Sequence, residues 1–151
     1  MTGTPRYTVD ESSGADIAAH LQSCNANFIA ALNERIPIAD YARKLARHAT
    51  RFEAWSDGNL VGLLAVYAND YERGFAHISN VSVLPGWQGM GIALAMLDQA
   101  VRRVNSLGFH TIGLEVEVNN QPARRLYERH DFAIGDRNGR FAKMSLNLKQ
   151  E

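Results

Sequence analysis

The stretch from Ile78 to Ala93, ISNVSVLPGWQGMGIA, constrains the fold of this chain more than any other. It consists of a β-branched run, a Pro-Gly turn and two glycines that lead into a helix. Because Gly89 and Gly91 have no Cβ, the backbone N–H groups of residues 88–93 can converge on one anion at the helix N-terminus. The pattern indicates a phosphate or pyrophosphate site, although a Gly-x-Gly before a helix also occurs as a plain tight turn.

Two better-known phosphate loops do not fit this stretch. No Gly-Lys-Ser or Gly-Lys-Thr follows, so the lysine and the hydroxyl of a P-loop are missing. Leu94 stands where the dinucleotide-binding fingerprint has its third glycine, and no second βαβ half is evident. An anion site of another type is therefore expected here.

Length, charge and cysteine content limit the class of protein. A chain of 151 residues is the size of one domain, which we expect to span residues 1–151. A formal net charge of zero argues against a general affinity for nucleic acid or an anionic membrane. Cys24 is the only cysteine, has no obvious histidine neighbour and is expected to be a small helix residue. Without a signal-like start or a long apolar run, a cytoplasmic protein is expected.

Hydrophobic periodicity and turn residues predict strands and helices along the whole chain. Asp57-Gly58 and Asn138-Gly139 are hairpin signals. His48 is expected to be half-buried at the end of a helix that opens at Pro37. Strands are expected at 7–9, 51–56, 60–67, 75–84, 111–118, 132–136 and 140–148, and helices at 15–34, from Pro37, before Gly108 and after Asn120.

The strand predicted at 111–118 alternates apolar and polar residues. Its apolar positions are expected to face the core, so Glu115 and Glu117 share the opposite face. After it, Asn120 can cap a helix whose residues Asn120, Ala123 and Tyr127 lie on one side. A glutamate on such a face is usually only solvated, and a tyrosine in such a helix can be a packing residue.

Two ordered motifs resemble those of the GCN5-related N-acetyltransferase (GNAT) family. QGMGIA at 88–93 is similar to the family's Gln/Arg-x-x-Gly-x-Gly/Ala, and it follows the family's usual Val-x-Pro. NQPARRLYERHDF at 120–132 is similar to Asn-x-x-Ala-x-x-Leu-Tyr-x-x-x-Gly-Phe. Asp131 replaces the usual glycine, and aspartate tolerates the left-handed backbone expected there. The resemblance covers roughly residues 50–148.

The resemblance implies a fold, a donor substrate and the residues that hold it. The fold is an α/β (mixed α+β) GNAT fold: a mostly antiparallel sheet, splayed between its fourth and fifth strands and flanked by about four helices. The donor is acetyl-CoA, whose pyrophosphate meets the loop amides and whose pantetheine arm pairs with the strand at 81–83. The implied donor-binding residues are Val81, Val83, Gln88, Gly89, Met90, Gly91, Ile92, Ala93, Asn120 and Ala123.

The resemblance also implies roles in acetyl transfer. Glu115 matches the glutamate that acts as the base in family members acting on protein N-termini, with Asn80 holding a relaying water and Glu117 as the alternative base. Tyr127 is the implied proton donor to the departing thiolate, and a backbone amide near Val83 is the implied oxyanion donor. In solution a thiol has a pKa of about 8.5 and a phenol about 10, so this transfer is expected to be near balance. The five histidines show no metal-ligand spacing, and no metal is expected.

Acetyl transfer to a primary amine by direct attack in a ternary complex is therefore the expected function. A small amine such as an amino sugar or amino acid is the first expectation for the acceptor. The alternatives are a peptide N-terminus, as for ribosomal-protein-alanine acetyltransferases, and a non-catalytic acyl-CoA sensor. A homodimer through the C-terminal strands is left open, and no partner among nucleic acids or membranes is expected.

Overall fold

A computed structural model describes residues 4–24 and 37–148. Its described strands form one seven-stranded sheet in the order β1-β2-β3-β4-β5-β7-β6, and only the β4–β5 pair is parallel. The strands are β1 (Arg6–Val9), β2 (Thr50–Ser56), β3 (Asn59–Asp70), β4 (Phe75–Val83), β5 (Thr111–Glu117), β6 (Ala133–Asn138) and β7 (Phe141–Asn147). The helices are α1 (Gly14–Ser23), α3 (Ile38–His48), α4 (Ile92–Ser106) and α5 (Gln121–Arg129), with a short 3₁₀ turn, η1, at Pro85–Trp87. The predicted mixed, mostly antiparallel α/β sheet is confirmed.

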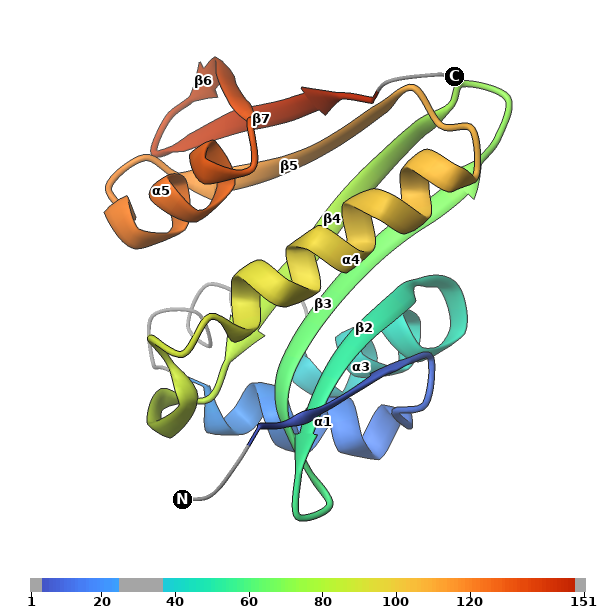
Figure 1. The fold of residues 1–151 in the computed structure, drawn as a ribbon, viewed down its shortest axis with the longest axis vertical. Helices are drawn as coiled ribbons and strands as arrows, with labels where there is room; N and C mark the ends of the chain where they lie inside the picture. The colour runs from blue at the N-terminus through green and yellow to red at the C-terminus, as the bar shows by residue number, and fades with distance from the viewer. Residues whose placement is uncertain (1–3, 25–36, 149–151) are drawn as a thin grey trace.

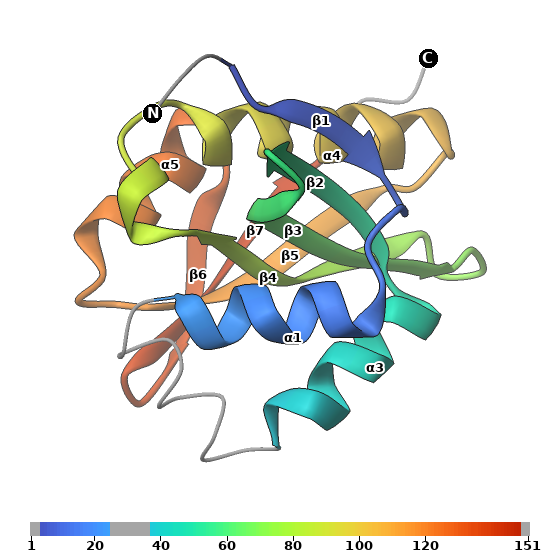
Figure 2. The ribbon, with the colours of Figure 1, turned by 90° about the horizontal axis from the view of Figure 1, so that it is seen from below.

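Helices cover both faces of this sheet. Figure 2 shows α1 and α3 on one face and α4 and α5 on the other. Figure 1 shows α4 running along the sheet, with α5 beside the end formed by β5, β6 and β7. The central strand β3 is buried on both faces, because Leu64 and Val66 join the core under α4 while Leu63 and Ala65 join the core under α1 and α3. Burial of these apolar side chains is the main force that holds the layers together.

The turns adopt the conformations that their residues favour. Asp57 and Gly58 both have positive φ, of 50° and 78°, which is the requirement of a type I′ hairpin turn. Gly139 has φ 64° in the last hairpin. Asp131 has φ 70°, so the left-handed backbone expected where the family has glycine is confirmed.

Some local expectations need correction. β3 continues to Asp70 instead of ending at residue 67, so the following turn is shorter than expected. α1 ends at Ser23, and the rest of the helix expected over 15–34 lies outside the described residues apart from Cys24. The prediction for His48 was wrong: the residue is exposed, because the buried face of α3 consists of Tyr41, Ala42 and Leu45.

Candidate active site

The glycine loop ends in a helix N-terminus that no side chain of the described chain caps. Gly89 and Gly91 have φ of 80° and 81°, and Gly91 is the N-cap of α4. The first turn of α4 holds no acidic residue and no side-chain cap. By contrast, the side chains of Ser13 and Asn120 cap α1 and α5. The free N–H groups in the first turn of α4, together with the helix dipole, therefore suit an anion from outside the chain.

The surroundings of this loop leave room for such an anion. A Cβ placed on Gly89 or Gly91 would meet no atom within 4 Å, so the space in front of the loop is open. The Gln88 side chain donates from Nε2 to the Val83 carbonyl oxygen at 3.1 Å, which ties the loop to the end of β4. Met90 is 53% exposed at the tip. The loop thus presents backbone donors to open space, an arrangement that suits an anionic ligand.

Strands β4 and β5 pair over only three residues and then separate. Their parallel register runs from Phe75 opposite Thr111 to His77 opposite Gly113. Beyond this point, within residues 4–24 and 37–148, β4 pairs only with β3, and β5 only with β7. A register irregularity between Ala65 and Val66 of β3 falls at the start of the separated part of β4. The predicted splay between the fourth and fifth strands is confirmed, and it leaves the Val81–Val83 edge free to pair with an extended ligand.

Glu115 lines a cavity of about 500 Å³. Its neighbours Leu114 and Val116 pack in the core under α4, so strand alternation places the Glu115 side chain on the opposite face of the sheet. Glu115 is exposed, and no ion pair to it occurs among the described residues. Its cross-strand neighbour on β7 is Lys143. The cavity is lined by Phe75, His77, Gly113, Leu114, Glu115, Gly135, Asp136, Lys143, Met144 and Ser145. Sequence reasoning identified Glu115 but missed His77, a histidine that lines the same cavity and responds to the charge of Glu115.

Two neighbours of Glu115 differ in their electrostatic setting. Burial lowers the pKa of His77, and the negative charge of Glu115 acts in the opposite direction. Glu117, two residues along β5, lies 3.6 Å from Arg140 through Oε2 and Nε, with both side chains about half exposed. An exposed ion pair of this kind contributes little to stability, but it occupies the Glu117 carboxylate.

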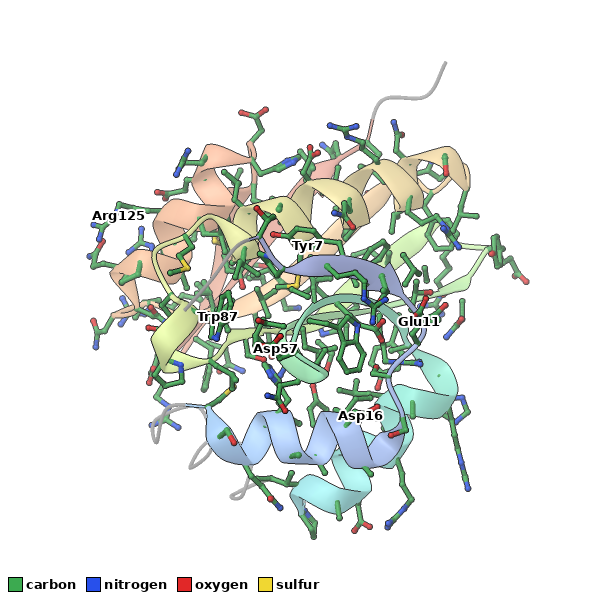
Figure 3. The ribbon with its side chains drawn as sticks, turned by 60° about the horizontal axis from the view of Figure 1, so that its bottom comes forward. Tyr7, Glu11, Asp16, Asp57, Trp87 and Arg125 are labelled. Atoms are coloured by element: carbon green, nitrogen blue, oxygen red, sulfur yellow. The ribbon has the colours of Figure 1, made fainter. Side chains whose placement is uncertain are left out.

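Helix α5 holds Tyr127 inside the core. The helix begins at the Asn120 cap, whose Oδ1 accepts a hydrogen bond from the Ala123 N–H at 3.2 Å. Tyr127 is 7% exposed and packs beside Phe132, with ring centroids 6.0 Å apart. Burial raises the pKa of Tyr127 to about 12. The expectation that proton transfer from Tyr127 to a thiolate is near balance used the pKa of a phenol in water, and it is corrected here. Arg125 of the same helix points outward to solvent (Figure 3).

Asn80 lies in the separated part of β4 and is 3% exposed. Its side chain bonds to Ser82 at 2.8 Å, and Ser82 bonds in turn to His20 of α1 at 2.9 Å. Cys24 lies 3.6 Å from the same histidine, which corrects the expectation of no histidine neighbour. The spacing of four residues between His20 and Cys24 on one helix face was the signal that could have revealed this contact.

A second cavity, of about 340 Å³, lies between α1, the β2–β3 turn and η1. Asp16, Asp57 and Trp87 are among its lining residues, one from each of these elements, and Figure 3 labels all three. Among the described residues no group of three His, Cys, Asp or Glu side chains could hold a metal ion. In the same part of the chain, every helix is too short or too polar to cross a membrane.

A family model described as the Acetyltransferase (GNAT) family matches residues 16–132. The chain belongs to this family. GNAT acetyltransferases are acyl-CoA-dependent N-acyltransferases. The family resemblance noted in the loop at 88–93 and in the helix at 120–132 is thereby confirmed.

Three individual proteins that resemble this GNAT chain share between 14% and 30% of its residues over the aligned parts. N-alpha-acetyltransferase MAK3 of Arabidopsis thaliana is 30% identical over 82 residues, which are 54% of this chain and 43% of that protein. The matched part thus spans less than half of that relative. The ribosomal-protein-S18-alanine N-acetyltransferase of Escherichia coli superposes with a TM-score of 0.75 at 18% identity, covering 97% of this chain and 96% of that one. PaiA N-acetyltransferase of Thermoplasma acidophilum, solved in complex with coenzyme A, gives 0.71 at 14% identity, covering 95% and 99%. At such identities the two structures share the fold.

Proposed function

We propose that this GNAT chain transfers the acetyl group of acetyl-CoA to the primary amine of a small molecule by direct attack in a ternary complex. The observation that carries the proposal is the opening between β4 and β5, which has an uncapped helix N-terminus at one end and the Glu115 cavity on one face. Such an opening can place a donor and an acceptor against each other without a covalent enzyme intermediate.

The donor is held by backbone groups in this proposal. The N–H groups of residues 88–93 bind the pyrophosphate, assisted by the dipole of α4. Val81 and Val83 on the free edge of β4 pair with the pantetheine arm, as an added strand would. Asn120 and Ala123 line the other side from α5. Bound acetyl-CoA supplies an activated thioester carbonyl, and the rest of the chemistry falls to the chain.

The acceptor must be neutral before it attacks. A primary amine has a pKa of about 10 and is protonated at neutral pH, so a base must remove a proton. Glu115 takes this role, directly or through a water held by Asn80, and Glu117 is the less suitable carboxylate because Arg140 engages it. The neutral amine nitrogen then forms a bond to the carbonyl carbon while the carbon–sulfur bond breaks.

The reaction also needs a group that stabilises the negative charge on the carbonyl oxygen and a group that protonates the departing sulfur. A backbone N–H near Val83 stabilises the negative charge that develops on the carbonyl oxygen. Tyr127 donates its hydroxyl proton to the departing sulfur. The second proton, which the nitrogen loses as the amide forms, returns to the Tyr127 oxygen through solvent, and Glu115 releases the first amine proton to solvent. With a pKa of about 12, Tyr127 gives up this proton only if the sulfur is also buried, because burial raises the proton affinity of a thiolate as it does that of a phenolate.

The lining of the Glu115 cavity favours a small polar amine as the acceptor. Beside the apolar residues Phe75, Leu114 and Met144, the cavity is lined by five residues whose side chains can form hydrogen bonds or carry charge: His77, Glu115, Asp136, Lys143 and Ser145. A few converging polar groups on an apolar floor are typical of a small-ligand site. An amino sugar or an amino acid would satisfy several of these groups at once.

A peptide N-terminus is the second candidate acceptor. All residues of β6 are exposed, and β6 is an edge strand, so an extended peptide could run beside it. The names of two similar proteins, an N-alpha-acetyltransferase and a ribosomal-protein-alanine acetyltransferase, point in the same direction.

A screen for free-thiol release separates these possibilities. The purified protein and acetyl-CoA are incubated with amines, amino sugars, amino acids and short peptides, and thiol release is followed with a chromogenic disulfide. Release with small amines but not with peptides supports the first candidate, and the reverse result supports the second. Tight acetyl-CoA binding with no release for any acceptor would favour a sensor module and contradict the proposal.

A further inference from the structure

Two oppositely charged side chains stand side by side in the Glu115 cavity. Glu115 of β5 and Lys143 of β7 are register partners, and both residues line the cavity. Directly opposite residues of an antiparallel pair share one face of the sheet, with Cβ atoms about 5 Å apart. Both side chains are exposed, and neither takes part in an ion pair within residues 4–24 and 37–148. The anion and the cation are therefore each available to a charged group of a ligand.

An exposed aromatic ring lies next to this pair. A Cβ on Gly113 would lie 3.0 Å from Cζ of Phe75, so the Phe75 ring packs directly against Gly113. Gly113 precedes Glu115 by two residues, which places the ring on the same face of the sheet, about 7 Å along β5. Phe75 is 44% exposed and lines the cavity. The cavity thus presents an apolar surface beside an anion and a cation.

The other titratable groups set the net charge of the cavity. Asp136 of β6 adds a second exposed carboxylate, which forms no ion pair with Lys143 or any other described residue. Burial lowers the pKa of His77, so its imidazole is mainly neutral at pH 7. The described lining then carries two negative charges and one positive charge. Such a cavity disfavours an anion and accepts an amine or a zwitterion.

These groups match the three substituents of an α-amino acid, which carries an ammonium group, a carboxylate and a side chain on one carbon. We infer that the acceptor is an α-amino acid with an apolar side chain, and that Lys143 and Phe75 determine this specificity. Glu115 faces the ammonium group, Lys143 binds the carboxylate, and the Phe75 ring contacts the side chain. This inference rests on the proposed transfer to a primary amine.

The other candidate acceptors leave one of these groups unused. An amino sugar lacks the carboxylate, and a peptide N-terminus carries a neutral amide in its place. Neither of them gives Lys143 an anionic partner. The carboxylate is therefore the feature of the acceptor that an experiment has to isolate.

Leucine and leucinamide isolate the carboxylate, because they have the same shape and differ in this one charge. Lys143→Gln is expected to lower the ratio of kcat/KM for leucine to that for leucinamide about fivefold to tenfold, the value of one exposed charge-assisted hydrogen bond. The two probes differ in amine pKa, but this difference is the same in every variant and does not affect the comparison. Lys44→Gln is the matched control, because Lys44 is an exposed lysine of α3 outside the cavity lining, and it should leave the ratio unchanged.

Leucine and glycine isolate the apolar side chain. Phe75→Ala is expected to lower the ratio of kcat/KM for leucine to that for glycine about fivefold, because the leucine side chain loses the ring that it contacts. A general loss of folded protein would lower both values alike and leave their ratio unchanged. Phe75→Leu keeps an apolar surface and should retain most of the ratio. Tyr71→Ala is the control, because Tyr71 is 64% exposed and packs against Phe109 outside the cavity lining.

Binding without turnover separates this inference from the proposed function. Calorimetry with the protein saturated with coenzyme A gives the affinity for leucine in the native chain and in Lys143→Gln. Transfer to amines with an unchanged leucine ratio in Lys143→Gln, or transfer to leucinamide and peptides but not to leucine, would overturn the amino-acid acceptor while acetyl transfer stands. Leucine binding that weakens in Lys143→Gln, without transfer to any amine, would contradict the proposed function and leave an amino-acid site with no acceptor role. Neither binding nor transfer would remove both.

Discussion

Arg51 and Glu53 stand two residues apart on β2 and form a buried ion pair, with Nε and Oε2 3.6 Å apart. The Glu53 side chain is fully buried and accepts hydrogen bonds from the Ser12 N–H at 2.8 Å and from the Thr8 hydroxyl at 2.5 Å. Arg51 donates to the Ser12 carbonyl oxygen at 2.9 Å. The pair therefore fixes the residues just before α1, the helix that carries His20.

Removal of this carboxylate should be costly. We expect Glu53→Ala to lower the free energy of unfolding by about 3–5 kcal/mol, because it removes the buried partner of Arg51 and the acceptor of the Ser12 and Thr8 hydrogen bonds. Among the described residues, only the half-exposed Asp10, at 3.6 Å, then remains to pair with the Arg51 guanidinium. Urea unfolding followed by circular dichroism measures the loss. Glu72→Ala, at an exposed glutamate in the β3–β4 turn, is the control and should change stability by less than about 0.5 kcal/mol. A loss below about 1 kcal/mol in Glu53→Ala would show that the pair contributes little.

The glycine loop offers a matched pair of substitutions. Gly91 and Gly139 both have positive φ, of 81° and 64°, and a Cβ on either would meet no protein atom within 4 Å. Alanine at either position should therefore cost a similar roughly 1–2 kcal/mol of backbone strain. Only Gly91→Ala places its methyl group where the pyrophosphate would lie, so only this variant should raise the KM for acetyl-CoA, at least tenfold. Equal KM values in the two variants would contradict a pyrophosphate site at the loop.

The two carboxylates on β5 can be tested against each other. Glu115→Gln is expected to lower kcat/KM at neutral pH at least tenfold, because an amide cannot take the proton of the amine. Glu117→Gln removes a carboxylate only two residues away that Arg140 already engages, and it should change kcat/KM by less than twofold. Initial rates over a range of pH measure both variants. A larger loss of kcat/KM in Glu117→Gln than in Glu115→Gln would identify Glu117, and not Glu115, as the base.

Turn chemistry explains why much of the fold could be predicted from the sequence. The left-handed backbone at Asp131 and the hairpin at Asp57-Gly58 depend on adjacent residues alone, so the local sequence determines them. The uncapped start of α4 likewise follows from the glycines and from the lack of an acidic residue in its first turn. These local features position the loop at 88–93.

Features that depend on distant residues could not be predicted in the same way. The contact between His20 and Ser82 joins residues 62 positions apart, and the buried state of Glu53 depends on partners 41 or more positions away. No local pattern distinguishes such a glutamate from a solvated one on a strand. The raised pKa of Tyr127 is also a tertiary effect, since it comes from burial in the assembled core.

Buried histidines should make stability depend on pH. Burial lowers the pKa of both His20 and His77, so the unfolded chain binds more protons than the folded one below about pH 6.5. The free energy of unfolding should therefore fall as the pH drops from about 7 to about 5. His20→Gln should show a smaller fall than the native protein, whereas His48→Gln, at an exposed position, should match it. Parallel slopes for the native protein and His20→Gln would contradict a neutral buried His20.

Tyr127→Phe isolates the proton donor from the packing of α5. The phenyl ring retains the contact with Phe132, so the fold and the affinity for acetyl-CoA should be nearly unchanged. Turnover should fall at least tenfold, because the departing thiolate loses its proton source. Since the pKa of Tyr127 is about 12, its hydroxyl stays protonated throughout the working range, and any loss of activity of the native protein between about pH 8 and pH 10 should persist in Tyr127→Phe. Thermal-shift titration gives the affinity, and thiol release gives the turnover. Full activity in Tyr127→Phe would reduce this tyrosine to a packing residue of the core.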